Sequence, residues 1–246
     1  PPLSPAGLSW ISIFCVSMKT DALSSRMKRV ACCFKLYDII RIDHFRGFDE
    51  YYAIPYGDET AENGEWMPGP GMDLVGRLTA WFNNVSFIAE DLGSLTPEVH
   101  KMLADSGLPG MKVLEFAFDP NSLSDYLPHR IGENSICYAG THDNNTLRGW
   151  IDEESAETLA FAREYLGIGE SDDLAAAVLR AGMRSKAELF VFQMQDVLGL
   201  GAEARINTPG TVGGNWCWRM KPGLLTPQLE KSLRRMAYIY GRSDKK

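Results

Sequence analysis

The sequence has few cysteines, and they form no recognisable motif. Its 246 residues contain five cysteines, an odd number, at positions 15, 32, 33, 137 and 217. No two of them are spaced as CxxC, and cysteines and histidines do not cluster at the spacing of a zinc site. The pattern predicts neither a disulfide framework nor a structural metal, and it favours a reducing compartment such as the cytosol or an organelle stroma.

Long hydrophobic runs and positive charge are also scarce. The longest apolar stretch, residues 8–18, is about half of the roughly 20 residues that span a bilayer, and no basic segment of a secretory signal precedes it. The net charge is −7, without a block of lysine and arginine. These absences argue against a membrane or a nucleic acid as the main partner. Because no GxGxxG or GxxxxGKS/T motif follows an apolar run, no cofactor is predicted.

What the sequence does contain is an alternation of short apolar runs and longer amphipathic segments. The apolar runs cover residues 36–43, 84–91, 110–118, 135–143 and 189–196. Helices are expected at 97–104, stopped by Gly107, and at 153–166, 173–189 and 226–240. Continuous apolar runs are typical of parallel strands, and their alternation with helices indicates an α/β fold. The predicted architecture is a (β/α)8 barrel, whose chemistry lies at the C-terminal ends of the strands.

Acidic residues end four of these five expected strands. They are Asp43, Glu90 with Asp91, Asp143 and Asp196. A single aspartate at such a position is common in a turn or a helix cap. As a group, with arginine and histidine around two of them, they predict a pocket lined by carboxylates.

Three of these carboxyl groups suit different chemical roles. Arg41 and Asp43 share one face of a strand, and a guanidinium favours the ionised carboxylate that a nucleophile requires; a structural ion pair is the alternative. Glu90 follows the apolar run SFIA, a setting that suits a general acid, unless its side chain faces solvent. Asp143, in the stretch GTHDNNT, is either part of an Asx-type turn or a second ionised carboxylate beside a neutral His142.

Several carboxylates without a metal or phosphate motif are what glycosyl transfer needs. One carboxylate attacks the anomeric carbon, and a carboxylic acid protonates the leaving oxygen. Aromatic rings then provide platforms for sugars, although such rings also belong to protein cores. The candidates near the expected strand ends are Trp66, Phe116, Phe118, Trp216 and Trp218.

Seven motifs, in this order along the chain, make the sequence similar to a known family. They read RIDHFRGF, IPYGDETAENGEWMPGPG, IAEDLG, LPGMKVLEFAF, YAGTHDNNTLRGW, MQDVLGLGAEARINTPGT and GNWCWR. Together they resemble the 4-alpha-glucanotransferases, the amylomaltases or disproportionating enzymes of bacteria and plastids, within the alpha-amylase clan. The resemblance covers about residues 26–240.

The resemblance implies a retaining transfer of an α-1,4-glucan segment to the 4-hydroxyl of an acceptor glucan or glucose, through a covalent glucosyl-enzyme. Asp43 matches the family's nucleophile, Glu90 its acid/base and Asp143 the carboxylate that stabilises the transition state. The other matching positions are Arg41 and His142 on the donor side, Phe116 on the acceptor side, and Trp66 and Asn207 in segments without an individual role. The implied partners are α-1,4-glucans and maltooligosaccharides, in the cytoplasm or the plastid stroma.

The first part of the chain departs from the family. Residues 1–25 do not resemble it, whereas residues 26–246 match its catalytic domain. We therefore expect an incomplete (β/α)8 barrel, with strands 4–8 present and strands 1–3 missing. Because an open barrel has two unpaired edges and lacks part of the donor subsites, the isolated chain is expected to be poorly active or inactive.

Three other functions remain open from the sequence. An α-glucan hydrolase of the same clan would raise the number of reducing ends, which disproportionation does not. A non-catalytic carbohydrate-binding remnant would bind a maltooligosaccharide without turnover. A metalloenzyme using Asp43, His44, Glu90 and His142 is the third, although these residues do not follow a ligand spacing such as HxxxH.

Overall fold

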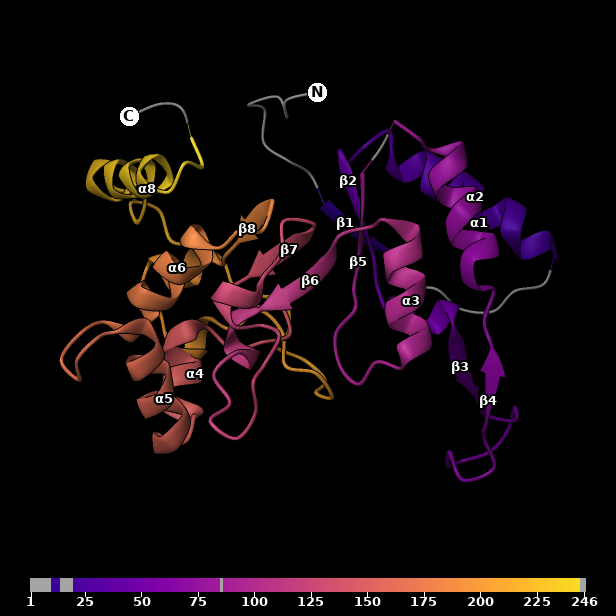
Figure 1. Cartoon of the computed structure of the whole chain (residues 1–246), viewed down its shortest axis with the longest axis horizontal. Helices are drawn as coiled ribbons and strands as arrows, with labels where there is room; N and C mark the ends of the chain where they lie inside the picture. Colours follow the sequence, from indigo (N-terminus) through magenta and orange to yellow (C-terminus); the bar gives the residue numbers. More distant parts are fainter. Residues whose placement is uncertain (1–9, 14–19, 85, 244–246) are drawn as a thin grey trace. The chain divides into compact units, whose positions relative to one another are not determined.

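The computed structural model describes residues 10–13, 20–84 and 86–243, with side chains from residue 27 onward. The chain forms two compact units, Pro1–Met111 (unit 1) and Lys112–Lys246 (unit 2). Strands and helices alternate along both (Figure 1). This alternation confirms the predicted α/β class.

Unit 1 is built on a three-stranded parallel sheet in the order β1-β2-β5. Its strands are β1 (Trp10–Ile13), β2 (Ile39–Ile42) and β5 (Ser86–Ala89). An antiparallel hairpin lies between β2 and the second helix of the unit. The remaining elements are α1 (Thr20–Cys33), the 3-10 helix η1 (Phe45–Phe48), β3 (Glu50–Ala53), β4 (Glu65–Pro68), α2 (Gly71–Trp81) and α3 (Pro97–Ser106).

The central strand β2 is apolar on both faces, and this explains where its one charged residue lies. Ile40 and Ile42 are buried and belong to one hydrophobic cluster with Val75 and Leu78 of α2. A strand covered on both sides must be apolar at successive positions, since transfer of this surface from water is the main favourable term. Arg41 is only partly buried, and it lies near the C-terminal end of this central strand.

Local sequence determines both ends of α3. The hydroxyl of Thr96 accepts the N–H of Val99, and Pro97 occupies the first helical position. Gly107 ends the helix with φ = 66°, a left-handed conformation that costs a glycine little. The helix predicted from this pattern is confirmed, two residues longer than expected.

Unit 2 carries the second sheet, in the order β6-β7-β8. Its strands are β6 (Gly110–Val113, which begins in unit 1), β7 (Ser135–Tyr138) and β8 (Leu189–Val191), and β7 and β8 run parallel. Its helices are α4 (Leu147–Glu153), α5 (Ala156–Leu166), α6 (Leu174–Arg184), α7 (Met194–Val197) and α8 (Pro227–Ile239), with the 3-10 helices η2 (Leu114–Phe116), η3 (Pro128–Arg130) and η4 (Ala202–Ala204).

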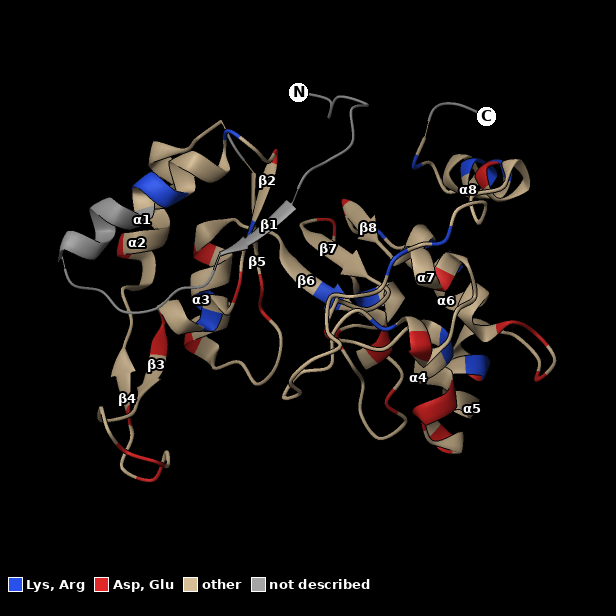
Figure 2. Ribbon diagram, turned by 180° about the vertical axis from the view of Figure 1, so that it is seen from behind, with Lys and Arg blue, Asp and Glu red and all other residues tan. Residues whose placement is uncertain are grey.

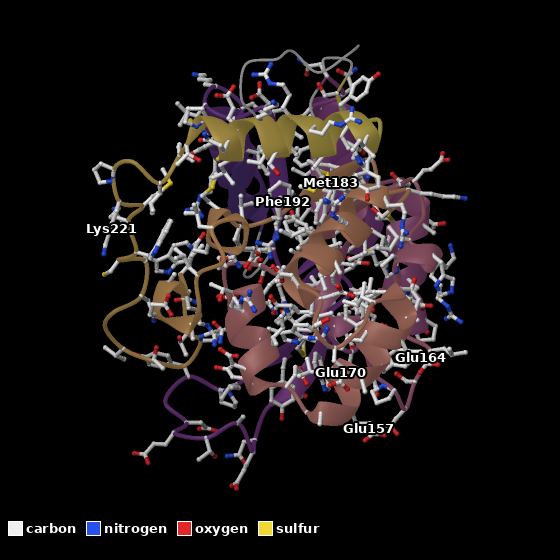
Figure 3. All side chains as sticks on the ribbon, turned by 90° about the vertical axis from the view of Figure 1, so that its left-hand side faces the viewer. Glu157, Glu164, Glu170, Met183, Phe192 and Lys221 are labelled. Atoms are coloured by element: carbon white, nitrogen blue, oxygen red, sulfur yellow. The ribbon has the colours of Figure 1, made fainter. Side chains whose placement is uncertain are left out.

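The core of unit 2 packs α6 closely against the sheet. A Cβ atom at Gly182 would collide with the ring of Phe190 in β8, so glycine is what allows this approach. All four residues of β7 are buried, and burial raises the pKa of the Cys137 thiol to about 12. Cys137 is therefore an inert core residue. On the outer surface, Glu157 and Glu164 of α5 extend away from the core (Figure 3).

Each predicted apolar run contains a strand, but the strands are shorter than predicted. Residues 110–118 pass from β6 into η2, and residues 189–196 pass from β8 into α7. Asp196 therefore lies on a helix, and Asp143 lies in a turn five residues after the end of β7, so the prediction that these two residues end strands was wrong. The predicted helix 153–166 is interrupted after Glu154, where Ser155 caps α5 by accepting the N–H of Thr158. The predicted helix 173–189 ends at Arg184, because the chain must turn into β8.

Several elements were not predicted, among them β1, the β3–β4 hairpin and the helices α1, α2, α4 and α7. Strand β1 lies within residues 1–25 and pairs in parallel with β2. Most of residues 1–25, which were expected not to resemble the family, cannot be compared with that expectation, because residues 1–9 and 14–19 lie outside the described residues. The hairpin was missed because its strands are only four residues long and are exposed or partly buried, so that they form no extended apolar run.

Charged residues of both signs are distributed along the ribbons of both units (Figure 2). Within the described residues, no helix is both long enough and apolar enough to cross a bilayer. Four of the cysteines, Cys32, Cys33, Cys137 and Cys217, are free thiols. Cys15 lies outside the described residues.

Candidate active site

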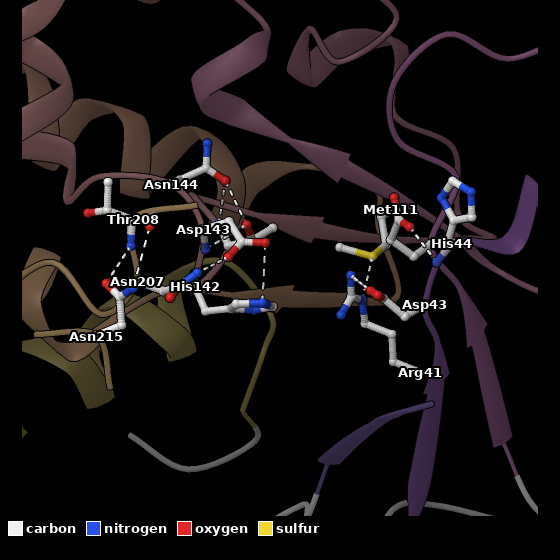
Figure 4. Close-up of polar contacts among 12 residues, drawn as sticks. Arg41, Asp43, His44, Met111, His142, Asp143, Asn144, Asn207, Thr208 and Asn215 are labelled. Atoms are coloured by element: carbon white, nitrogen blue, oxygen red, sulfur yellow. Dashed lines mark hydrogen bonds and ion pairs between the residues drawn. The ribbon is translucent and has the colours of Figure 1, made fainter. Parts of the chain in front are cut away.

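Arg41 and Asp43 form an ion pair at the end of β2. The distance from Arg41 Nη2 to Asp43 Oδ1 is 2.5 Å, and the two side chains are only 12% and 17% exposed. Arg41 Nε also points at the sulfur of Met111, 3.2 Å away (Figure 4). The pairing follows from the strand geometry, in which residues two apart share a face. The ion pair confirms the prediction that Arg41 and Asp43 share one face of the strand. The guanidinium of Arg41 orients the Asp43 carboxylate.

Glu90, at the end of the neighbouring strand β5, is held by hydrogen bonds to backbone groups. Its N–H donates to the carbonyl of Ile42 at 2.8 Å, which extends the β2–β5 ladder by one residue. Its Oε2 accepts the N–H of His44 at 2.7 Å, and its Oε1 accepts the N–H of Leu92 at 2.9 Å. Because Ile42 pairs with Ala89, Asp43 and Glu90 both lie one residue beyond the ladder, on strands about 4.8 Å apart.

His44 adopts an unusual backbone conformation that brings its N–H to Glu90. Its φ of 52° and ψ of 53° lie in the left-handed region, which costs a residue with a side chain roughly 1–3 kcal/mol. Gly47 packs against the His44 ring, and a Cβ atom there would come within 3.0 Å of the ring carbon Cδ2. The strained turn thus serves to clamp the Glu90 carboxylate beside Asp43.

Asp91, the second acidic residue of this strand end, has a structural role. It is buried, and its Oδ1 accepts the N–H of Met111 at 2.5 Å. A Cβ atom at Gly110 would overlap the Asp91 carboxylate, so the close approach requires glycine. The contact anchors the start of β6 next to the end of β5.

Trp66 belongs to the hairpin and is 54% exposed. The guanidinium of Arg46 lies 4.9 Å from its ring centroid, and the ring of Tyr52 packs against it edge-on at 5.3 Å. Arg46 also pairs with Glu50 at 2.8 Å and donates to the carbonyl of Ser94 at 2.8 Å. Trp66 is therefore an exposed aromatic surface with a fixed orientation, as a sugar platform requires.

In unit 2, Asp143 lies in the segment Thr141–Leu147, which we term the Asp143 turn. Its Oδ1 accepts a hydrogen bond from Asn207 Nδ2 at 2.6 Å, and its backbone carbonyl accepts one from Arg205 Nη2 at 2.7 Å. His142 Nε2 lies 3.4 Å from Asp143 Oδ2 (Figure 4). The carboxylate is about half exposed, so it remains accessible while its orientation is fixed.

The loop that supplies Asn207 also places an aromatic ring over His142. Asn215 accepts the N–H of Thr208 at 3.0 Å and closes the loop, and Trp216 adopts φ = 62° with its N–H on the carbonyl of Ile206 at 2.7 Å. The Trp216 ring then lies 5.1 Å from the ring of His142. Trp216, named above only as an aromatic candidate, thus borders the Asp143 turn.

Phe116 lies in η2 and is 47% exposed, with its ring 6.1 Å from that of Tyr126. Its neighbour Glu115 points the other way and is only 8% exposed. Burial, and then the charge of Asp196, raise the pKa of Glu115 to about 8. Burial also raises the pKa of Asp196 to about 6. Sequence reasoning missed Glu115, although an acidic residue inside the apolar stretch VLEFAF was a usable signal.

The predicted site residues therefore form two groups, each within its own unit. Unit 1 brings together Arg41, Asp43 and Glu90, and carries Trp66 on the hairpin. Unit 2 brings together His142, Asp143 and Asn207, and adds Arg205, which the sequence did not single out. Within the described residues, no three histidine, cysteine, aspartate or glutamate side chains are arranged to hold a metal ion, so the metalloenzyme alternative gains no geometric support.

Comparisons with known proteins show which proteins the chain is similar to. A family model described as 4-alpha-glucanotransferase matches residues 13–226. The chain is 43% identical to the 4-alpha-glucanotransferase of Clostridium butyricum over 217 residues, which is 88% of this chain and 45% of that protein. It is 40% identical to the chloroplastic/amyloplastic 4-alpha-glucanotransferase of Arabidopsis thaliana over 229 residues, which is 92% of this chain and 40% of that protein.

A solved structure is also similar. An amylomaltase from Streptococcus agalactiae in complex with acarbose matches with a TM-score of 0.84 and 37% sequence identity. The match covers 89% of this chain and 45% of that chain. The present chain thus spans somewhat less than half of the length of the relatives it matches.

Proposed function

The chain belongs to the 4-alpha-glucanotransferase family, and from this membership we propose that it carries the reacting groups for retaining transfer of α-1,4-glucan segments. The observation that carries the proposal is the Arg41–Asp43 ion pair beside the clamped carboxylate of Glu90. Two carboxyl groups on neighbouring strands fit the separation of about 5–5.5 Å that retaining enzymes use.

In the first step, Asp43 attacks the anomeric carbon of the donor glucan, and Glu90 protonates the departing glycosidic oxygen. The products are a covalent glucosyl-enzyme and a shortened glucan. Arg41 orients the attacking oxygen through the ion pair. In the second step, Glu90 takes the proton of the acceptor 4-hydroxyl, which attacks the same carbon from the face that the leaving group vacated, and a new α-1,4 bond forms.

Asp143 stabilises the positive charge that develops on the sugar ring in both steps. Its support comes from Asn207 and Arg205, which fix the carboxylate and the backbone of the Asp143 turn. His142, held between Asp143 and the Trp216 ring, hydrogen-bonds donor hydroxyl groups. Groups fixed before the reaction need no reorganisation when charge develops, and this is the usual source of electrostatic catalysis.

Transfer to a sugar rather than to water depends on acceptor binding. The exposed rings of Trp66 and Phe116 are the proposed platforms, because a stacked sugar displaces water from the reacting centre. We assign Phe116 to the acceptor side and leave Trp66 as a general glucan contact.

The finer architecture is part of the same proposal. Strands β2, β5, β6, β7 and β8 would be strands 4–8 of a (β/α)8 barrel, with residues 26–246 as catalytic-domain sequence. The parallel pairing of β1 with β2 suggests that β1 occupies the position of the preceding barrel strand. This revises the expectation that no strand would precede β2.

The proposed substrates are α-1,4-glucans and maltooligosaccharides. The relative in complex with acarbose and the plastid relative of Arabidopsis thaliana support this substrate class. We propose the cytoplasm or the plastid stroma as the compartment, in agreement with four free thiols.

The test is a long incubation with maltotriose, followed by separation of the products. Transfer predicts glucose and a ladder of longer maltooligosaccharides, with a constant number of reducing ends, and this result would show the expectation of a poorly active chain to be wrong. Asp43→Asn should abolish the ladder, whereas Asp152→Asn, at an exposed position of α4, should not. A rise in reducing ends would indicate hydrolysis instead. Acarbose binding without any product would favour a non-catalytic carbohydrate-binding protein.

A further inference from the structure

Unit 2 contains two buried carboxyl groups that the proposed mechanism does not use. Glu115 is 8% exposed and Asp196 is 6% exposed. Each has one oxygen, Glu115 Oε1 and Asp196 Oδ2, that is buried and has no hydrogen-bond partner among the described residues. Two charged carboxylates so placed would repel each other in a medium of low polarity, whereas one retained proton removes a charge and supplies a donor.

Asp196 holds the far end of the Asp143 turn. Its Oδ1 accepts the N–H of Leu147, the first residue of α4, at 2.7 Å. Gln193, the N-cap of α7, holds the near end, because its Nε2 donates to the carbonyl of Thr141 at 2.9 Å. The segment that carries His142 and Asp143 is thus fixed at both ends from α7.

Glu115 holds the middle of the Asp143 turn. Its Oε1 lies so close to Gly140 that a Cβ atom there would collide with it. Its carboxyl group is hydrogen-bonded to the side chain of Asn144. Because Asn144 Oδ1 already accepts the N–H and the hydroxyl of Thr141, at 2.9 and 2.7 Å, the Asn144 amide N–H is the donor to Glu115. Thr141 Oγ1 in turn accepts the N–H of Asp143 at 3.3 Å.

Other charged groups around the pair come from several elements. Glu153 of α4 disfavours ionisation of Glu115, and Arg205 after η4 favours it. Asp196 also lines a cavity of about 290 Å³ together with Arg148 of α4, Arg180 of α6 and Asp173, the N-cap of α6. Burial is the largest influence on both carboxyl groups, and it raises the pKa of each.

We infer that Glu115 and Asp196 retain one proton between them at neutral pH, and that this singly protonated pair is a positioning device for the Asp143 turn. The importance of the pair for catalysis rests on the proposed role of Asp143. The existence of the protonated pair does not depend on that role. Loss of the proton would place two negative charges beneath the turn. The repulsion would displace Glu115 from Gly140 and Asn144 and would loosen the bonds through Thr141 that orient Asp143.

The test follows the amide NMR signals of Thr141 and Asp143 in the full chain from pH 6 to pH 10. In the wild type, both signals should shift with a common midpoint near pH 8. Glu115→Gln keeps the shape of a protonated carboxyl group and should abolish this transition. Glu157→Gln, on the outer face of α5, removes the same charge and should leave it unchanged. A wild-type turn without the transition, or a transition that persists in Glu115→Gln, would overturn the inference.

A second pair of measurements covers the case in which Glu115→Gln does not fold. Asp196→Asn removes the repelling neighbour and should move the midpoint to lower pH, and an unmoved midpoint would refute the coupling. In the wild type, the infrared C=O band of a protonated carboxyl group should be present at pH 7 and disappear above pH 8. These readouts do not depend on sugar transfer. If the pair titrates but no sugar is transferred, the inference holds and the proposed function is refuted. If sugar is transferred but the pair does not titrate, the proposed function holds and the inference is refuted.

Discussion

Replacement of Glu115 by glutamine should remove a large part of the pH dependence of stability. Burial, and secondarily Asp196, raise the pKa of Glu115 from 4.5 to about 8. A carboxyl group with a higher pKa in the folded state binds its proton more tightly when the protein is folded. The free energy of unfolding therefore falls as the pH rises from about 4.5 to about 8, and the loss is complete above pH 8.

The size of the effect follows from the same two values. At about 1.4 kcal/mol per pH unit, the difference between 4.5 and about 8 corresponds to roughly 5 kcal/mol over the whole range. Between pH 6.5 and pH 8.5, the linkage relation leaves a loss of about 2 kcal/mol. Asp196, with a pKa of about 6, contributes mainly below this interval. A loss of this size matters, since a domain is stable by only about 5–15 kcal/mol.

Urea unfolding at a series of pH values measures this quantity. The wild type should lose about 2 kcal/mol between pH 6.5 and pH 8.5, and Glu115→Gln should lose much less. Glu157→Gln is the matched control, because it removes the same charge from an exposed position and should retain the wild-type slope. Parallel slopes for the wild type and Glu115→Gln would show that the Glu115 carboxyl group is already ionised at neutral pH, contrary to its expected raised pKa.

Four further substitutions, one of them a control, test other parts of the structure. Arg41→Met should leave the fold intact but reduce transfer at least tenfold, because Asp43 loses the cation that orients it; initial rates with maltotriose measure this. Gly110→Ala should lower the free energy of unfolding by about 1–3 kcal/mol, since its Cβ atom has no room. Gly76→Ala, in α2 with open space around it, is its control and should raise that free energy by about 0.5–1 kcal/mol. Thr96→Ala should cost about 1 kcal/mol, measured by urea unfolding, through the lost N-cap of α3.

Local features of the site were predictable because their rules span only a few residues. The two-residue periodicity of a strand predicted that Arg41 and Asp43 share a face, and the ion pair confirms it. The cap and stop signals at Thr96 and Gly107 likewise predicted α3. Strand lengths were less predictable: the apolar pattern of residues 110–118 continues through η2, since a buried 3-10 turn needs the same residue types as a strand.

Contacts between distant segments were not predictable from pattern alone. Asn207 reaches Asp143 across 64 positions of sequence, and no local periodicity encodes that hydrogen bond. Glu115 looked like one more residue of a core strand, because its burial depends on Gly140 and Asn144 lying against it. Strand β1 was overlooked because four residues beside a central strand carry too little pattern of their own.

The central proposal is that Asp43 is the nucleophile, and covalent trapping tests this directly. The chain is incubated with 5-fluoro-α-D-glucosyl fluoride, digested, and analysed by mass spectrometry. If Asp43 is the nucleophile, one fluoroglucosyl group is added to the peptide that contains Asp43, and the addition is absent in Asp43→Asn. A label on another carboxylate, or the same labelling in Asp43→Asn, would contradict this proposal.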